Sequence, residues 1–173
     1  ILVTGASGLV GSAIIRDWSA RHELFAVSRR ALPQGPSVST ILADLAASWP
    51  VDALPGRIDV VIHLAQSNHW QDFPGAALDM FGVNVAATTT LLNYAAKAGA
   101  THFVLASTGG LYGSSAQPIT EASPLCQAHG PLEYYFATKR AAEMLALSYR
   151  HRFCVSIVRP FFRFRTLVRT KAP

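Results

Sequence analysis

The sequence predicts an α/β fold in which a doubly wound parallel sheet is covered by helices on both faces. Short runs of β-branched apolar residues alternate with longer segments of helical periodicity, a pattern typical of right-handed crossovers between parallel strands. The run 58–64 is apolar almost throughout, as expected of a strand buried on both faces. A glycine-rich turn joins the first strand to the first helix. We expect six or seven strands, with a ligand across their carboxyl ends.

Local periodicity and turn residues place the elements along the chain. Short β-branched runs indicate strands, and apolar residues at helical spacing, such as Val10, Ile14 and Trp18, indicate helices. The alanine-rich helix ends at Gly99, a typical C-terminal stop. The expected strands are 1–4, 24–28, 38–42, 58–64, 102–107 and 154–158, and the expected helices are 9–21, 76–98 and 133–150. Irregular structure is expected at 33–36 and 109–131, and a loop as long as the second is often functional.

Composition excludes several classes of protein. With 173 residues, 50% of them hydrophobic and 14% charged, the chain suits one globular domain and not a disordered one. No run approaches the roughly 18 apolar residues of a membrane span, and the start lacks the features of a secretory signal. Cys126 and Cys154 are too few for a disulfide framework and lack metal-ligand spacing. We therefore expect a cytoplasmic protein with no metal site and no membrane partner.

The net charge of +5 comes from the end of the chain. Seven of the 15 lysines and arginines follow residue 149, and no acidic residue follows Glu143. Residues 1–149 carry eight basic and ten acidic side chains, a net charge of −2. Because nucleic-acid-binding domains carry a basic patch on their body, we expect no nucleic-acid partner. Binding through the arginine-rich tail is the weaker alternative.

The strongest local signal is the glycine loop, Thr4–Gly11 (TGASGLVG), between the first strand and the first helix. Glycines let a backbone turn tightly and approach a pyrophosphate, which the free N–H groups and dipole of the helix then face. The spacing is Gly-x-x-Gly-x-x-Gly and not the Gly-x-Gly-x-x-Gly of the standard dinucleotide fingerprint. The alternative is a turn that serves only strand–helix packing. The context favours a dinucleotide.

The end of the second strand bears on the choice of dinucleotide. The standard fingerprint places an acidic residue there, which accepts hydrogen bonds from the adenosine ribose. Here the strand ends in Ser28-Arg29-Arg30. An arginine cannot accept those bonds but pairs with a 2′-phosphate. Arg29 therefore favours NADP, with NAD as the alternative, while Arg30 is equally explained as a solvated surface residue.

Further motifs make the chain resemble the extended short-chain dehydrogenase/reductases of the NAD-dependent epimerase/dehydratase group. They occur in the family's order and at its intervals. The motifs are Thr4–Gly11, Ala43-Asp44-Leu45, Val61-Ile62-His63-Leu64-Ala65, Asn84-Val85 with Thr88, Ser107-Thr108-Gly109-Gly110-Leu111-Tyr112-Gly113, Tyr135-Phe136-Ala137-Thr138-Lys139 and Arg159-Pro160-Phe161. The resemblance implies a Rossmann-type domain over residues 1–162.

The resemblance also implies the cofactor contacts. Asp44 and Leu45 would contact the adenine, Leu64, Ala65 and Gln66 would line the cofactor after the fourth strand, and Asn84 would lie near the active site. Asn84 has an alternative role as a helix amide that bonds to backbone. The residues expected to bind the cofactor are Gly5, Ala6, Ser7, Gly8, Leu9, Val10, Gly11, Arg29, Asp44, Leu45, Leu64, Ala65, Gln66, Asn84, Ser107, Tyr135, Lys139, Pro160 and Phe161.

Tyr135 and Lys139 are the expected catalytic pair. Four residues apart on a helix, their side chains share one face. A nearby ammonium favours phenolate, as does the positive nicotinamide ring of an oxidised cofactor, so we expect the pKa of Tyr135 to fall towards working pH. Tyr135 could then take a proton from a substrate hydroxyl, or return one to a carbonyl, during hydride transfer. Thr108 aligns with the family's catalytic Ser/Thr and would bond the reacting oxygen, with a smaller role for Ser107.

The chain departs from the family pattern in two places. Sugar-nucleotide 4,6-dehydratases of this group usually carry Asp-Glu after the catalytic Thr, whereas this chain has Gly109-Gly110. Epimerisation or carbonyl reduction therefore fits better than loss of water. The family also continues beyond Arg-Pro-Phe into a segment that completes the substrate site. Residues 163–173 form instead a basic tail, so we expect the substrate domain to be mostly absent from this chain.

The leading hypothesis is an NAD(P)-dependent epimerase or reductase that acts at a hydroxyl or carbonyl carbon, for example of a nucleotide sugar. The alternative is a cofactor-binding domain or fragment without turnover. The resemblance also suggests a homodimer in which the helices 76–98 and 133–150 meet their copies. Packing of these alanine-rich helices on the sheet explains their small residues equally well.

Overall fold

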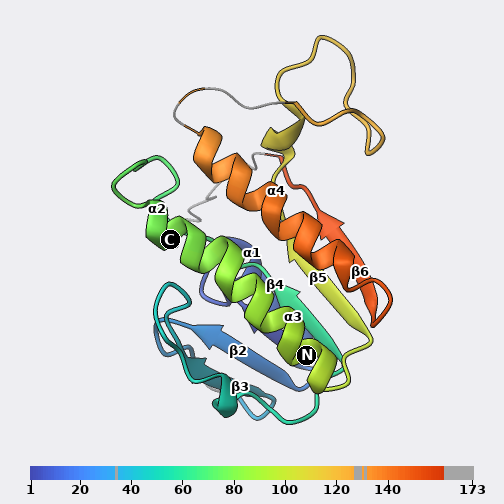
Figure 1. Cartoon of the computed structure of the whole chain (residues 1–173). Coiled ribbons are helices and arrows are strands. Elements are labelled where there is room, and N and C mark those ends of the chain that lie inside the picture. Colours follow the sequence, from blue (N-terminus) through green and yellow to red (C-terminus); the bar gives the residue numbers. More distant parts are fainter. Residues whose placement is uncertain (34, 127–129, 131, 162–173) are drawn as a thin grey trace, which may run out of the picture.

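The computed structural model describes residues 1–33, 35–126, 130 and 132–161 of the 173-residue chain. It contains one sheet of six parallel strands in the order β3-β2-β1-β4-β5-β6 (Figure 1). The strands are β1 (Leu2–Thr4), β2 (Leu24–Ser28), β3 (Val38–Leu42), β4 (Val60–His63), β5 (His102–Ala106) and β6 (Cys154–Val158). This order is that of the dinucleotide-binding fold, with its reversal point between β1 and β4. The predicted fold class is confirmed.

Helices cover both faces of the sheet. The helical elements are α1 (Leu9–Trp18), η1 (Val51–Ala53), α2 (Ala77–Phe81), η2 (Gly82–Ala86), α3 (Ala87–Lys97), η3 (Gly109–Tyr112) and α4 (Glu133–Ser148). Figure 1 shows α2, α3 and α4 on one face and α1 on the other. No helix in the described ranges is long and apolar enough to cross a bilayer.

The alternation of side chains along the strands divides the core between the two faces. Leu2 of β1 and Val61 of β4 pack in the cluster beneath α3 and α4. Their neighbours Val3 and Ile62 pack in the cluster that includes Ile14 of α1. Because successive residues of a strand point to opposite faces, a strand with a core on each side has to be apolar throughout. This explains the unbroken apolar run around β4.

The helix expected at 76–98 is interrupted. It consists of α2, a π-helical stretch η2 and α3. At Gly82, a Cβ would lie 3.1 Å from the carbonyl oxygen of Ala46, so the helix and that loop pack backbone to backbone. A π-helical turn inserts an extra residue and rotates the side chains that follow. Here the segment holds Val83 and Asn84 in the interior.

The other boundaries differ from expectation by a few residues at most. The helix expected at 9–21 ends at Trp18, where the chain closes with turns rather than further helix. The helix expected at 133–150 ends at Ser148. Gly99 has a φ of +76° after α3, as expected of a helix stop. The basic tail 163–173 lies outside the described residues, so the predicted boundary after residue 162 stays a prediction.

Candidate active site

The glycine loop brings the backbone of β1 and α1 into contact with that of the residues after β4. Gly5 has a φ of +65°, and a Cβ there would lie 2.8 Å from the backbone nitrogen of Ala65. At Gly11, a Cβ would lie 2.3 Å from the carbonyl oxygen of Gly5. Real side chains do not fit at such distances, so both positions require glycine. The first turn of α1 thereby lies directly against the loop, where its free N–H groups can face an anion.

A cleft of about 460 Å³ opens at the carboxyl ends of the strands, a size within the usual range for ligand sites. Most of the expected cofactor residues line it: Gly5, Ser7, Gly8, Leu9, Val10, Gly11, Arg29, Asp44, Leu45, Leu64, Ala65, Gln66, Ser107 and Pro160. Ala6 is fully buried beside the loop. Tyr135, Lys139, Asn84 and Phe161 are not part of the lining.

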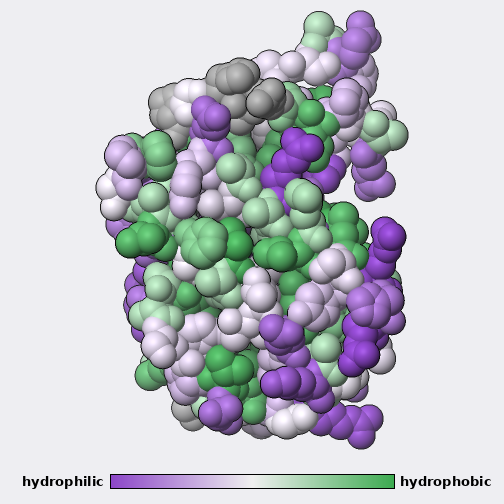
Figure 2. Space-filling model, in the orientation of Figure 1, coloured by the Kyte–Doolittle hydropathy of each residue, from purple (hydrophilic) through white to green (hydrophobic). Residues whose placement is uncertain are grey.

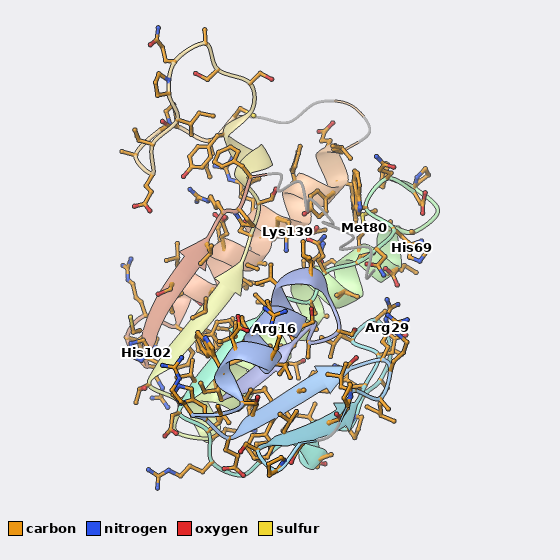
Figure 3. All side chains as sticks on the ribbon, turned by 180° about the vertical axis from the view of Figure 1, so that it is seen from behind. Arg16, Arg29, His69, Met80, His102 and Lys139 are labelled. Carbon is orange, nitrogen blue, oxygen red and sulfur yellow. The ribbon has the colours of Figure 1, made fainter. Side chains whose placement is uncertain are left out.

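The rim of the cleft at the end of β2 carries two exposed arginines, Arg29 and Arg30. Figure 3 shows Arg29 beyond the end of that strand. The hydroxyl of Ser28 accepts a hydrogen bond from the backbone N–H of Arg30 at 3.2 Å. Asp44, on the neighbouring loop after β3, accepts one from the backbone N–H of Ala46 at 3.1 Å.

Helix α4 carries the expected catalytic pair and brings Tyr135 against a residue of the cleft lining. The Tyr135 hydroxyl donates to Oε1 of Gln66, a cleft-lining residue, at 3.1 Å. The Lys139 ammonium donates to the carbonyl oxygen of Ala106, at the end of β5, at 2.8 Å. Thr108 follows two residues later and caps η3, where its hydroxyl accepts a hydrogen bond from Gly110. The fold thus gathers Thr108, Tyr135 and Gln66 at one end of the sheet.

The charges of the pair depend mainly on burial. Burial raises the pKa of Tyr135, and the nearby Thr108 hydroxyl only partly opposes this. The expected lowering of that pKa is therefore wrong for the chain by itself, because desolvation of the phenolate outweighs the favourable contacts. Burial also lowers the pKa of Lys139 to about 8, against the opposing charge of Glu143. Lys139 is consequently an ammonium held close to its own titration point.

Asn84 connects two elements of the site through hydrogen bonds of its buried side chain. Its side-chain oxygen accepts from the backbone N–H of Ser67 at 3.2 Å, and its amide nitrogen donates to the hydroxyl of Thr138 at 3.0 Å. One buried amide therefore ties the loop after β4 to α4. The alternative role considered for Asn84, a helix amide bonded to backbone, describes part of this arrangement. The bond to Thr138 is a side-chain contact between elements, which sequence spacing does not reveal.

His63 joins the two sides of the site within the core. It is 1% exposed, and its ring nitrogens lie 2.6 Å from the hydroxyl of Thr4 and 3.0 Å from that of Thr88. Burial, assisted by the charge of Lys139, lowers its pKa to about 3. His63 is therefore a neutral core residue at physiological pH. Nowhere in the described ranges do three His, Cys, Asp or Glu side chains form a metal-ligand group.

Several residues of the site were not found from the sequence. Ser67, Asn68, Asp79 and Val83 also line the cleft, and Ser67 donates a hydrogen bond to the Asp79 carboxylate. Ser67 and Asn68 follow the carboxyl end of β4, and that position could have indicated them. Asp79 and Val83 reach the cleft from α2 and η2. No pattern in the neighbouring sequence indicates such a contact between distant segments.

Two aromatic rings pack near the ring of Tyr135. Its ring centroid lies 6.2 Å from that of Trp70 and 5.5 Å from that of Phe136. Tyr134 stacks on Phe73 at 4.8 Å. Phe161 lies away from the cleft lining and stacks on the ring of Tyr112 at 6.2 Å.

The chain is similar to known proteins over most of its length. The model of the NAD dependent epimerase/dehydratase family matches residues 1–164. A dTDP-glucose 4,6-dehydratase of Streptomyces antibioticus is 31% identical over 88% of this chain and 49% of its own length. A UDP-glucose 4-epimerase of Azospirillum brasilense is 28% identical over 84% of this chain and 43% of its own. The chain thus spans about half the length of these relatives.

Solved structures show the same relationship. MoeE5 in complex with UDP-glucuronic acid and NAD is 34% identical, with a TM-score of 0.75 over 91% of this chain and 53% of that one. DesIV of Streptomyces venezuelae, a dTDP-glucose 4,6-dehydratase with NAD and TYD bound, is 26% identical, with a TM-score of 0.76 over 91% and 54%. The chain belongs to the NAD-dependent epimerase/dehydratase family.

Proposed function

We propose that this chain is the cofactor-binding and catalytic part of an enzyme that interconverts a hydroxyl and a carbonyl at one carbon of a nucleotide sugar, as an epimerase or a reductase. The observation that carries the proposal is the position of Tyr135 beside both Thr108 and Gln66, at the edge of a cleft built on a glycine loop. The family relationship supports a nicotinamide cofactor and a nucleotide-sugar substrate.

The cleft fits a dinucleotide. Gly5 and Gly11 let the loop pack directly against neighbouring backbone, since a Cβ at either position would collide with it, and the start of α1 offers N–H groups to the charge of a pyrophosphate. Asp44 and Leu45 would hold the adenine, and Leu64 and Ala65 the adjoining part of the cofactor. A bound nicotinamide ring would supply the acceptor and donor of hydride.

The chain's own residues would handle the proton. In the oxidising direction, Tyr135 as phenolate accepts the proton of the substrate hydroxyl. In the reducing direction, its phenol returns that proton to the carbonyl oxygen. Thr108 would donate a hydrogen bond to the same oxygen and orient it. The charge of the Lys139 ammonium, four residues further along the same helix, would favour the phenolate against the desolvation that raises the Tyr135 pKa.

Loss of water is the less suitable reaction. The two residues after Thr108 are glycines, so this loop provides no carboxyl group as acid or base. A Cβ at Gly109 would lie 2.7 Å from the ring of Phe161, and one at Gly110 would lie 2.7 Å from the ring of Phe136. An Asp-Glu pair would therefore have to displace two aromatic rings. The two glycines therefore favour epimerisation or reduction, although relatives include dehydratases.

For the cofactor we propose a preference for NADP. The related structures contain NAD, so the preference depends on the exposed guanidinium of Arg29 at the rim of the cleft. Titration of cofactor fluorescence with NADPH and NADH tests it. Arg29→Asp should weaken NADPH binding at least about tenfold and spare NADH, because it replaces a cation by an anion at the 2′-phosphate. The matched control is Arg16→Asp on α1, which is outside the cleft lining.

We also propose a homodimer through the outer face of α2, α3 and α4. Large apolar side chains are exposed on this face, among them Leu78 at 86% and Met144 at 66%. Figure 2 shows hydrophobic surface gathered over these helices, and such patches often mark interfaces. Sedimentation should give a dimer for the parent and a monomer for Leu78→Glu/Met144→Glu. The expected cytoplasmic location and the lack of a nucleic-acid partner stay predictions.

Tyr135→Phe is the experiment that tests the proposed reaction. The variant removes the hydroxyl that exchanges the proton, so turnover of UDP- and dTDP-sugars should fall at least about 100-fold. Cofactor affinity should change little, because the cleft lining is intact. Tyr134→Phe is the matched control, since this hydroxyl belongs to the adjacent residue. Equal turnover in Tyr135→Phe and the parent overturns the proposed function. Cofactor binding without turnover in the parent supports the non-catalytic alternative.

A further inference from the structure

Glu143 continues the row of residues that begins with the catalytic pair. Tyr135, Lys139 and Glu143 recur every four residues along α4 and are 8%, 3% and 3% exposed. Residues at this spacing lie next to one another on a helix. A buried carboxylate is costly unless a cation and hydrogen bonds compensate it. The proposed function uses the first two residues of the row and gives no reason for the third.

Arg159, which follows β6, compensates the carboxylate. Its Nε donates to Oε1 of Glu143 at 2.8 Å and its Nη2 donates to Oε2 at 2.7 Å, so the pair is bidentate. The remaining guanidinium nitrogen, Nη1, donates to the hydroxyl of Tyr112 at 2.7 Å, and the guanidinium carbon lies 5.1 Å from the centre of that ring. Tyr112 belongs to η3, the turn that Thr108 caps. Arg159, Glu143 and Tyr112 together form what we call the Arg159 clamp. The clamp connects α4, the end of β6 and the turn that Thr108 caps.

Glu143 is ionised in this setting. Burial by itself would raise its pKa, but hydrogen bonds from Arg159 and a contact from the Ser107 hydroxyl lower it below the usual value. That Ser107 contact is looser than a regular hydrogen bond, since Ser107 Oγ has no such partner among the described residues. The negative charge therefore depends mainly on Arg159.

Lys139 experiences opposing influences from the groups around it. Burial favours its neutral form, whereas the Glu143 carboxylate favours the ammonium. The other titratable neighbours are Tyr135 on the same helix and His63 on β4, whose pKa the lysine helps to lower. Arg159 is directed at Glu143 and Tyr112. Glu143 is thus the nearby group that opposes the effect of burial on Lys139.

We propose that Glu143 is a positioning residue: clamped by Arg159, its carboxylate holds Lys139 as an ammonium and thereby maintains the charge that Tyr135 needs. The inference rests on the proposed function, since it concerns how the charge of Lys139 serves Tyr135. The competing interpretation is an ion pair that only joins α4 to β6. The two interpretations predict different pKa values for Lys139 when the Glu143 carboxylate is replaced by an amide of the same shape.

NMR can measure Lys139 directly. The chain has three lysines, Lys97, Lys139 and Lys171, so labelling the lysine ε-carbons gives few signals, and Lys97→Arg assists their assignment. In Glu143→Gln we expect the pKa of Lys139 to fall from about 8 by about one pH unit. Glu133→Gln removes a charge from the exposed first turn of the same helix and should leave that pKa unchanged. Glu143→Asp, which keeps the charge, should restore most of the shift.

Kinetics provides the second measurement. In Glu143→Gln, the alkaline limb of the pH profile of kcat should shift to lower pH by as much as the Lys139 pKa falls, because Lys139 loses its proton at a lower pH. An ion pair that only stabilises the fold would, when removed, lower kcat equally at every pH. If Glu143→Gln does not fold, Glu143→Gln/Arg159→Gln is compared with Arg159→Gln, because this double variant contains no unpaired buried charge. The pKa of Lys139 should be lower in the double variant.

The outcomes separate the two proposals. An unchanged Lys139 pKa in folded Glu143→Gln overturns the role of Glu143, whatever the activity of Tyr135→Phe. A lowered Lys139 pKa together with full turnover in Tyr135→Phe supports the electrostatic contact and overturns the proposed function. A uniform loss of kcat with no change in the Lys139 pKa assigns the clamp to structure alone.

Discussion

The two sides of the site are built in different ways. Around the glycine loop, the backbone itself forms the surface, and the essential property of Gly5 and Gly11 is the absence of a side chain. Around α4, the surface depends on buried polar side chains that contact other elements, among them Asn84, Lys139 and Glu143. A backbone site requires a strict local spacing, and a side-chain site requires partners from distant segments. The first can be recognised in a sequence, whereas the second depends on the tertiary fold.

His63 couples these two sides, and its titration should give the largest effect on stability. Its pKa in the folded chain is about 3, below the ordinary 6.5, so the unfolded chain binds a proton first as pH falls. Stability is therefore lost between about pH 6.5 and 3, by up to roughly 5 kcal/mol. Denaturant unfolding across this range should show a shallower pH dependence in His63→Gln than in the parent. The exposed His102→Gln is the control, and an equal slope in all three proteins contradicts the prediction.

Gly11→Ala should disrupt the backbone side of the site. The new Cβ would lie within 2.3 Å of a carbonyl oxygen and 2.7 Å of the Cα of Ala6, and backbone atoms cannot move away easily. We expect a loss of about 3 kcal/mol in stability and of measurable dinucleotide binding, read by thermal unfolding and fluorescence titration. At Gly8 the contact is 3.1 Å, so Gly8→Ala should cost less than about 1 kcal/mol. Equal effects of the two variants would refute the steric argument.

Asn84→Ala should weaken the side-chain side of the site. It leaves the N–H of Ser67 and the hydroxyl of Thr138 without their shared partner, which costs about 2 kcal/mol. The effect on kcat should exceed that on cofactor affinity, because α4 shifts while the glycine loop is intact. Asn93→Ala removes the exposed hydrogen bond with Tyr149 and serves as control. Urea unfolding and steady-state kinetics test this, and a larger loss of cofactor affinity than of kcat would contradict it.

Lys139→Met should have the smallest effect on stability, with the opposite sign. The pKa of Lys139 is about 8 in the fold, below the ordinary 10.5, so the folded chain holds this proton less tightly than the unfolded chain. Below pH 8 the full cost of the buried charge is present, and it diminishes as pH rises to about 10.5. We expect Lys139→Met to stabilise the chain by about 1 to 2 kcal/mol at neutral pH, with loss of turnover.

The pH dependence of that difference provides its check. The stability advantage of Lys139→Met over the parent should narrow between pH 8 and 10.5, whereas the exposed Lys97→Met should show no such narrowing. A destabilised Lys139→Met at neutral pH would mean that the hydrogen bond to Ala106 and the attraction of the Glu143 charge outweigh the cost of burial.

Much of the fold was predictable because its signals are local. The apolar run around β4, the helix stop at Gly99 and the spacing of the glycine loop each depend on neighbours within a few residues. The four-residue interval between Tyr135 and Lys139 also predicted a shared helix face. Extending that interval once more leads to Glu143, so the sequence contained an indication of the third residue. The ion pair of Glu143 with Arg159 became visible only in the folded structure.

The sequence by itself determined the order of strands and helices and the backbone shape of the glycine loop, and it predicted the catalytic pair. Periodicity and glycine spacing are properties of contiguous residues, which is the physical reason. The tertiary structure decided the charges and supports of those residues: the raised pKa of Tyr135, the tie through Asn84 and the clamp on Glu143. Desolvation and buried hydrogen bonds depend on groups distant in the chain, and only folding brings them together.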